Sequence, residues 1–492
     1  MRSSATSSPL SWSHAGESEA IVSEAIDRIS TEARWGGVED PWPQLFDWVE
    51  RHTGGRILEW TRQARWRPAW YLTVDIDGEV RQLYARCQRE ESMPWTRTLS
   101  LRREYDIMRT LHDEGVMVPA PLGFCEEPEA ILMASVEGRD RFDEHDDGHV
   151  RDTVIADYVG RLAAAHRLST TPFEAIGLSK PATPQDIGYM GFGLSEKWYR
   201  QVKPAPDPVI EFVIAWLHRH VPVHRRDVSW IHFDAGQFLH ADQRVTALMD
   251  VEFSCLGDPM ADLGAMRMRD TAQPIGDLTH AFKVYAAESG QPIDRRVVNF
   301  HAVRFALLTA MLSAGIRADP PAEFDLAQWQ AWSLMSLTIC LEIIAEENNY
   351  ALEPPPGLTY APVRNDAAYL SVQRIVDDVL ADEGLDNYLA FRLRVVRDLL
   401  PGLHRSAQAT PPVDALDRAE AEELLGACPR DWEQADQQLE DYVQRFGATQ
   451  EAQIVRLLAR RIRRQIDLIK PGMRDVREFH VRPIDWAAIP TT

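Results

Sequence analysis

Two short β-like runs near the middle of this 492-residue chain constrain its fold more than any other feature. The runs, at 229–233 and 244–251, stand in a region whose other segments have helical patterns. The first carries His232 and leads directly into Asp234, and the second carries Asp250. Because neighbouring strands bring their ends together at one edge, we expect the two carboxylates to lie close together.

Such a pair of carboxylates suits a divided chemical task. One, Asp234, can orient an attacking hydroxyl, and the other, Asp250, can hold Mg²⁺ against the phosphates of a nucleotide. An amide side chain, Gln237, stands between them in the sequence. The residues by themselves therefore indicate phosphoryl transfer.

The same segment resembles the catalytic loop and metal-binding segment of the aminoglycoside/choline phosphotransferase superfamily. The pattern of that superfamily is His-Gly-Asp, four residues and Asn, then Ile-Asp-Trp-Glu and Gly-Asp-Pro-x-x-Asp-Leu. Its second half is matched closely by Asp250-Val-Glu252 and by Gly-Asp-Pro-Met-Ala-Asp-Leu at 257–263. The resemblance covers about residues 54–350 and implies a small-molecule kinase that uses ATP and Mg²⁺.

The first half departs from the pattern, and two alignments are open. With His232 and Asp234 as the His-x-Asp pair, Asp234 is the catalytic base and the loop is two residues short. Gln237 then replaces Asn as a metal ligand beside Asp250, and His232 braces the loop. Without a gap, His232 takes the place of the base, which implies an altered base or an inactive kinase. We prefer the first alignment, because it keeps His-x-Asp intact and Gln is long enough to span a shortened loop.

The chain before this segment has the pattern of a small β-rich lobe. Within it, Pro119, Pro121 and Gly123 are expected to interrupt the helical pattern that precedes them. Strands are expected at 56–60, 69–74, 80–86 and 130–136, and a charged helix at about 97–113.

The resemblance assigns nucleotide contacts to this lobe. Kinases of this kind use a strand Lys that contacts phosphates and pairs with a helix Glu, and here Arg86 and Glu104 stand in those places. Arg keeps the charge but changes the geometry, because its guanidinium is a planar fork. The backbone near Ala134 and Ser135 would meet the adenine edge, as part of the hinge at 130–138.

The first hairpin lacks a Gly-x-Gly-x-x-Gly phosphate loop. Arg65 and Arg67 stand there instead, and their guanidinium groups are candidates to hold phosphates in place of backbone amides. The alternative is an exposed basic hairpin with no ligand.

The fold predicted from these patterns is α+β, a two-lobe protein-kinase-like fold with a C-terminal helical extension. In that extension, an apolar stripe from Ile454 to Ile469 predicts a packed helix whose arginines form a solvated basic side. The expected parts are a tail and helix at 1–53, a small β-rich lobe at 54–137, a mainly helical lobe with the catalytic loop at 138–350, and a helical accessory domain at 366–492.

The composition of the chain limits the classes of partner and the cellular compartment that we expect. A formal net charge of -22 argues against nucleic acid and anionic membranes as partners of the whole molecule. Five cysteines without a CxxC pair favour a reducing compartment, and no apolar run approaches the roughly 20 residues of a membrane helix. We therefore predict a cytoplasmic protein whose partners are a nucleotide and a small-molecule hydroxyl substrate.

The identity of the acceptor is not encoded in these motifs. The Arg86 exchange and the helical extension resemble a branch of phosphotransferases associated with acyl-CoA metabolism, which favours a hydroxyacyl-CoA or another metabolite. The competing hypothesis is a pseudokinase that binds nucleotide or metabolite without transfer. The shortened loop, Arg86 in place of Lys and the missing glycine loop favour that alternative.

Overall fold

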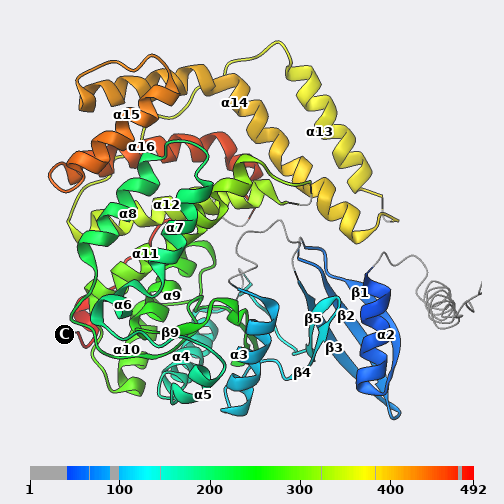
Figure 1. Ribbon diagram of the computed structural model, residues 1–492. Coiled ribbons are helices and arrows are strands. Elements are labelled where there is room, and N and C mark those ends of the chain that lie inside the picture. The colour runs from blue at the N-terminus through cyan, green and yellow to red at the C-terminus, as the bar shows by residue number, and fades with distance from the viewer. Residues whose placement is uncertain are drawn as a thin grey trace, which may run out of the picture.

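The computed structural model describes residues 41–65, 67–88, 99–143, 146–322, 324–382, 384–474 and 479–491. Residues 1–40 of the predicted N-terminal tail and helix lie outside the described residues. The described residues form a small lobe built on a sheet, a larger helical lobe, and a group of C-terminal helices (Figure 1). This is a two-lobe protein-kinase-like fold with a C-terminal helical extension.

One antiparallel sheet forms the small lobe, with strand order β1-β2-β3-β5-β4. Helix α2 (Trp42–Thr53) buries Leu45 and Phe46 in a core shared with Trp70 and Leu72 of the sheet. The β2–β3 hairpin turns at Asp77 and Gly78, both in the left-handed region, as expected for a tight turn. The strands are β1 (Arg56–Arg62), β2 (Ala69–Ile76), β3 (Glu79–Cys87), β4 (Pro121–Glu126) and β5 (Glu129–Ala134).

Strand β4 is an addition to the strands predicted from the sequence, in which Pro121 and Gly123 only interrupt the preceding helix. The strand pairs with β5 from Glu126 back to Pro121, with an irregularity between Pro121 and Gly123. Proline is tolerated here because β4 is an edge strand and Pro121 is its first residue.

Helix α3 (Leu101–Asp113) lies between the sheet and the larger lobe (Figure 1). Ser100 caps it by accepting a hydrogen bond from the backbone N–H of Arg103. Its apolar side contributes Ile107 and Leu111 to the main core, and its first turn carries the buried Glu104. The predicted helix is therefore present, beginning at Leu101.

The larger lobe is helical apart from two short antiparallel pairs that carry the acidic motif. β6 (Ser229–Ile231) pairs with β9 (Cys255–Gly257), and β7 (Phe238–Ala241) pairs with β8 (Arg244–Leu248). Its helices are α4 (Gly148–Ala165), α5 (Thr171–Ala175), α6 (Pro184–Tyr189), α7 (Phe192–Val202), α8 (Pro208–His220), α9 (Met260–Ala272), α10 (Leu278–Ser289), α11 (Arg295–Ala318) and α12 (Leu326–Glu347).

Helix α11 is long and apolar enough to cross a membrane by length and composition. However, 89% of its apolar window is buried inside the protein, as in the core helix of a globular lobe. It is the only described helix with this property.

Four further helices follow the Pro-rich segment after α12 (Figure 1). Residues of the last two share the main core with the larger lobe, including Leu439, Val443, Ile454 and Leu458. The core is therefore continuous across the sequence boundary proposed at 350–366. These helices are α13 (Asp366–Leu380), α14 (Asn387–Leu425), α15 (Trp432–Phe446) and α16 (Glu451–Ile469).

The arginines of α16 correct the expectation of a solvated basic side. Arg464 is 1% exposed and donates to Asp417 (2.7 Å) and Glu420 (2.6 Å) of α14. Arg463 donates to Glu342 of α12 at 2.7 Å. These arginines face carboxylates on neighbouring helices, because burying a guanidinium requires a partner charge.

We expect Arg464→Ala to lower the free energy of unfolding by about 3–5 kcal/mol, because two largely buried carboxylates lose their counter-charge. The control is Arg456→Ala, on an exposed part of the same helix, where Arg456 donates to the backbone oxygen of Ala351. Its effect should stay within about 0.5 kcal/mol. Denaturant unfolding of both variants measures the difference, and equal stabilities would contradict a structural role for the Arg464 ion pairs.

Candidate active site

The catalytic-loop segment is held by one carboxylate. Asp262 of α9 is fully buried and accepts hydrogen bonds from the backbone N–H groups of His232 (2.9 Å) and Phe233 (2.7 Å). Phe233 has a φ of 70°, a left-handed conformation that non-glycine residues adopt only where the surroundings require it. Asp262 therefore fixes the loop backbone just before Asp234.

His232 lies beneath the loop and is fully buried. Its ring Nε2 lies 2.7 Å from the backbone oxygen of Met249, the residue before Asp250. The imidazole thus joins the two halves of the acidic motif.

Asp234, Gln237 and Asp250, the three polar side chains singled out from the sequence, lie close together in the structure. Gln237 Nε2 donates to Asp234 Oδ2 at 2.6 Å and lies 3.4 Å from Asp250 Oδ2. Asp250 has a left-handed φ of 56° and leaves 25% of its side chain exposed, whereas Asp234 is only 4% exposed. The amide of Gln237 therefore bridges the two carboxylates.

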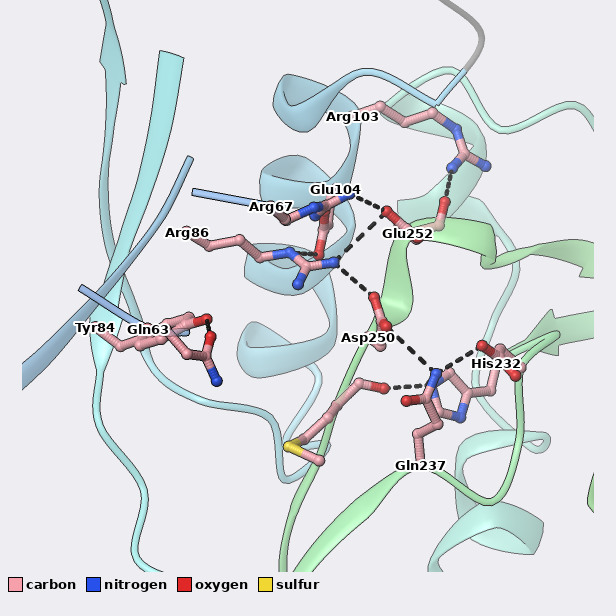
Figure 2. A network of polar contacts seen from close by, with 12 residues as sticks. Gln63, Arg67, Tyr84, Arg86, Arg103, Glu104, His232, Gln237, Asp250 and Glu252 are labelled. Atoms are coloured by element: carbon pink, nitrogen blue, oxygen red, sulfur yellow. Dashed lines mark hydrogen bonds and ion pairs between the residues drawn. The ribbon is translucent and has the colours of Figure 1, made fainter. Parts of the chain in front are cut away.

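A buried group of charges joins the small lobe to this site (Figure 2). Arg86 of β3 lies with Nε 2.8 Å from Glu104 Oε1, and its Nη2 donates to Asp250 Oδ1 at 2.6 Å. Arg67 donates to Glu252 Oε2 at 2.6 Å and lies 3.5 Å from Glu104 Oε2. We call Arg67, Arg86, Glu104, Asp250 and Glu252 the interlobe charge cluster.

The electrostatics of the interlobe charge cluster keep Arg86 ionised. Burial works against its positive charge, but Glu104, Asp250 and Glu252 outweigh burial and raise the pKa of Arg86. Arg86 is 7% exposed and Glu104 is 2% exposed, so the two do not form a surface pair.

Helix α3 is tied to the larger lobe by a further arginine. Arg103 donates to the backbone oxygens of Glu252 (2.8 Å) and Ser254 (2.5 Å). Arg103 stands next to Glu104 on the helix, so these bonds hold Glu104 against the segment that follows Asp250 (Figure 2).

The structure places the other predicted nucleotide residues as follows. Arg67 is 2% exposed, so the alternative of an exposed basic hairpin is wrong for this residue. Its guanidinium faces carboxylates, whereas Arg65 is partly exposed near the start of the turn. Ala134 ends β5, and the backbone N–H of Ser135 donates to the backbone oxygen of Gln82 at 3.0 Å. Contacts of these residues with a nucleotide stay predictions.

One site residue was missed from the sequence. Arg269 of α9 makes two ion-pair contacts with Asp234, from Nε to Oδ1 and from Nη2 to Oδ2. Its position seven residues after Asp262 puts both side chains on one face of the helix, since seven residues make about two turns. That spacing from the Gly-Asp-Pro-x-x-Asp motif is the signal that could have identified it.

Asp250 and Gln237 could supply two of the six oxygen ligands that Mg²⁺ requires. Mg²⁺ is commonly held by one or two protein oxygens, with phosphate oxygens and water completing its six ligands. Asp250 supplies a partly exposed carboxylate, and the Gln237 amide can supply an oxygen by turning over. Among the described residues no group of three or more His, Cys, Asp or Glu side chains could hold a metal. The two oxygens that Asp250 and Gln237 would supply match an ion whose other ligands are phosphate oxygens and water.

Part of the chain is similar to a known protein family. Residues 65–298 match the sequence profile described as the phosphotransferase enzyme family. The matched region includes β2, the interlobe charge cluster, the loop that carries Asp234, and α9. This part of the chain is therefore similar to phosphotransferases.

The chain is also similar, over part of its length, to curated proteins. A mouse protein, acyl-CoA dehydrogenase family member 10, is 28% identical over 173 residues, which are 33% of this chain and 16% of the mouse protein. Across the curated relatives the match spans 16% to 26% of the relative's length. The chain is thus similar to a minor part of each of these proteins.

Two solved structures are similar over most of their own length. Choline kinase from Streptococcus pneumoniae is 13% identical and has a TM-score of 0.44, covering 61% of this chain and 98% of its own. Macrolide 2'-phosphotransferase from Brachybacterium faecium is 18% identical and has a TM-score of 0.41, covering 56% and 98%.

Because the interlobe charge cluster is buried, we expect Glu104→Gln to lower the free energy of unfolding by about 3–5 kcal/mol. The change leaves Arg67 and Arg86 without the carboxylate that separates them. Glu126→Gln is the control, since Glu126 pairs with Arg102 at 2.8 Å but its side chain is 75% exposed. That pair should contribute about 0–1 kcal/mol. A small, equal effect of both changes in denaturant unfolding would show that Glu104 does not hold the cluster together.

Proposed function

We propose that the protein transfers the terminal phosphoryl group of ATP to a hydroxyl of a small molecule. The observation that carries the proposal is the contact of Asp234, Gln237 and Asp250 directly beside the buried Arg86–Glu104 pair. Phosphoryl transfer needs a hydroxyl-orienting carboxylate and a metal-binding carboxylate within one site, and these residues supply both. The phosphotransferase-family match supports the same reaction class.

Each residue has a proposed role. Asp234 accepts a hydrogen bond from the acceptor hydroxyl, and Asp250 with Gln237 would hold Mg²⁺, which neutralises charge on the phosphates when bound. A bond forms between the hydroxyl oxygen and the terminal phosphorus as the bond to the bridging oxygen breaks. The nucleoside diphosphate leaves, and the hydroxyl proton passes to Asp234.

His232 is the weaker candidate for the base. Its side chain is fully buried and its Nε2 is engaged with Met249. A base must come within hydrogen-bond reach of the proton that it accepts. This supports the alignment in which Asp234 has that role.

One observation favours a second function, the binding of a nucleotide or metabolite without transfer. Both site carboxylates face arginines, Asp234 with Arg269 and Asp250 with Arg86. Arginine in place of a metal would suit a protein that binds nucleotide or metabolite without transfer. The two functions differ in whether Mg²⁺ strengthens nucleotide binding through Asp250.

The acceptor class is supported only by similarity. Relatives named acyl-CoA dehydrogenase family members 10 and 11 match part of the chain, and this favours a hydroxyacyl-CoA as acceptor. We also propose a cytoplasmic location, and this proposal is based on the composition and on the scattered cysteines.

Asp234→Asn keeps the size of the side chain but removes the proton acceptor. We expect the transfer rate to fall by about 10²–10⁴ while ATP affinity stays within about twofold, because the loss is confined to the transition state. Asp250→Asn should instead weaken ATP binding in the presence of Mg²⁺ and leave binding in EDTA unchanged. Calorimetric titration and a radiolabelled transfer assay over hydroxylated metabolites measure both effects.

The control for both is Asp242→Asn, in the exposed β7–β8 turn, where Asn tolerates the left-handed φ of 48°. If Mg²⁺ has no effect on ATP affinity in the unmodified protein, the metal role of Asp250 is wrong. If ATP binds but no acceptor is phosphorylated, the binding function replaces the transferase.

Arg86→Ala should weaken ATP binding about tenfold or more, because a charge-assisted contact to phosphate is lost. Arg86→Lys should restore part of the affinity, since Lys keeps the charge without the planar fork. Arg81→Ala is the matched control, because Arg81 lies on the same strand with 53% of its side chain exposed and pairs with Glu79. Unchanged affinity in Arg86→Ala would limit Arg86 to a structural role in the interlobe charge cluster.

A further inference from the structure

Asp234 is held by two different side chains, and the stronger hold comes from Arg269. The guanidinium meets both carboxylate oxygens, with Nε on Oδ1 and Nη2 on Oδ2. Gln237 adds a third donor, to Oδ2 at 2.6 Å. A two-point contact with a planar guanidinium fixes the rotation of a carboxylate as well as its position.

The aliphatic part of Arg269 passes beside the loop. A Cβ built at Gly236, which has a φ of 101°, would lie 3.4 Å from Arg269 Cδ and 3.6 Å from its Cβ, at ordinary van der Waals distance. The backbone N–H of Gly236 donates to the hydroxyl of Tyr158 at 2.7 Å, which holds that stretch of loop in place. Arg269 therefore runs beneath the loop and reaches Asp234 from a supported position.

Helix α9 consequently contacts both the backbone of the loop and the Asp234 side chain that the loop carries. Asp262, near its start, binds the loop backbone at His232 and Phe233. Arg269, two turns later, binds the side chain that the loop presents. Burial opposes the charge on Arg269, but Asp234 outweighs burial and raises the pKa of Arg269.

The contacts of Arg269 leave Asp234 room for a further hydrogen bond. An ionised carboxylate offers about four lone-pair sites. Arg269 uses two, and Gln237 uses a third only while its amide nitrogen faces Asp234. We propose that Arg269 is a positioning residue that fixes Asp234 so that its remaining acceptor site faces the hydroxyl to be phosphorylated. This inference rests on the proposed transferase function.

The proposal predicts a specific kinetic effect. Arg269→Ala should lower kcat about 10²-fold, the loss expected for misplacing a reacting group by about 1 Å, and leave the KM for ATP within about twofold. Arg269→Lys should lose less, because it keeps the charge but not the two-point contact. If Arg269→Ala does not fold, Arg269→Gln, which keeps most of the length, is measured in its place.

The decisive measurement is a double-mutant cycle with Asp234→Asn, using single-turnover transfer from ATP. If Arg269 acts through Asp234, adding Arg269→Ala to Asp234→Asn should lower transfer by less than about twofold. A purely structural role would lower transfer by the same factor in both backgrounds, and that result would overturn the proposal. The control is Arg161→Ala, which removes a half-buried Arg–Asp pair with Asp157 (2.9 Å) outside the active site and should leave transfer unchanged.

The outcomes separate this inference from the proposed function. Full activity in Arg269→Ala, with transfer in the unmodified protein, would overturn the positioning role alone. Absence of transfer by the unmodified protein to every acceptor would overturn the transferase function, and the positioning role with it.

Discussion

The interlobe charge cluster is the interaction on which the geometry of the site depends. The small lobe contributes Arg67 and Arg86, helix α3 contributes Glu104, and the larger lobe contributes Asp250 and Glu252. A buried charge is costly unless it is paired, so each lobe must present its charges to the other. These ion pairs therefore hold the sheet of the small lobe in its position next to Asp250.

The cluster also explains how an arginine can occupy the place expected for lysine. The fork of Arg86 contacts Glu104 and Asp250 at the same time, with Glu252 3.5 Å away. A lysine ammonium is a compact charge without this fixed geometry. The exchange therefore favours a site in which the small lobe, α3 and the segment that carries Asp250 are held as one unit.

Helix α9 has the corresponding role within the larger lobe. Asp258 accepts from Arg225 at 2.7 Å and from the backbone N–H of Met260 at 3.0 Å, which secures the start of the helix. Burial opposes the charge on Asp258, but His301 and Arg225 outweigh it and lower the pKa of Asp258. Asp262 and Arg269 then reach the loop from a helix whose own start is fixed.

The C-terminal helices show how an acidic chain uses its arginines. With a formal net charge of -22, carboxylates outnumber cations, and the arginines of α16 are paired with Asp417, Glu420 and Glu342. These pairs attach α16 to α12 and α14 while its apolar stripe enters the main core. A helix with alternating apolar and basic faces therefore serves here as an internal support.

The sequence by itself indicated the fold class and the candidate site residues. The β-like runs and the acidic motif are short-range features, and they singled out Asp234, Gln237 and Asp250, whereas Arg86 and Glu104 came from the family resemblance. The resemblance also paired Arg86 with Glu104, whose Nε and Oε1 atoms lie 2.8 Å apart in the structure. The edge strand β4 was missed because its proline and glycine have the local signature of a turn, and only pairing with β5 makes it a strand.

Only the tertiary structure decided which charges face one another. Arg67 and Glu252 are 185 residues apart, so no local pattern could pair them. The spacing from Asp262 places Arg269 on the helix face that meets the loop, but only the packed structure pairs it with Asp234. The burial of the α16 arginines likewise depends on which helices surround them. Pairing of buried charges is a property of the packed molecule, since the cost of desolvation exists only after the lobes and helices have come together.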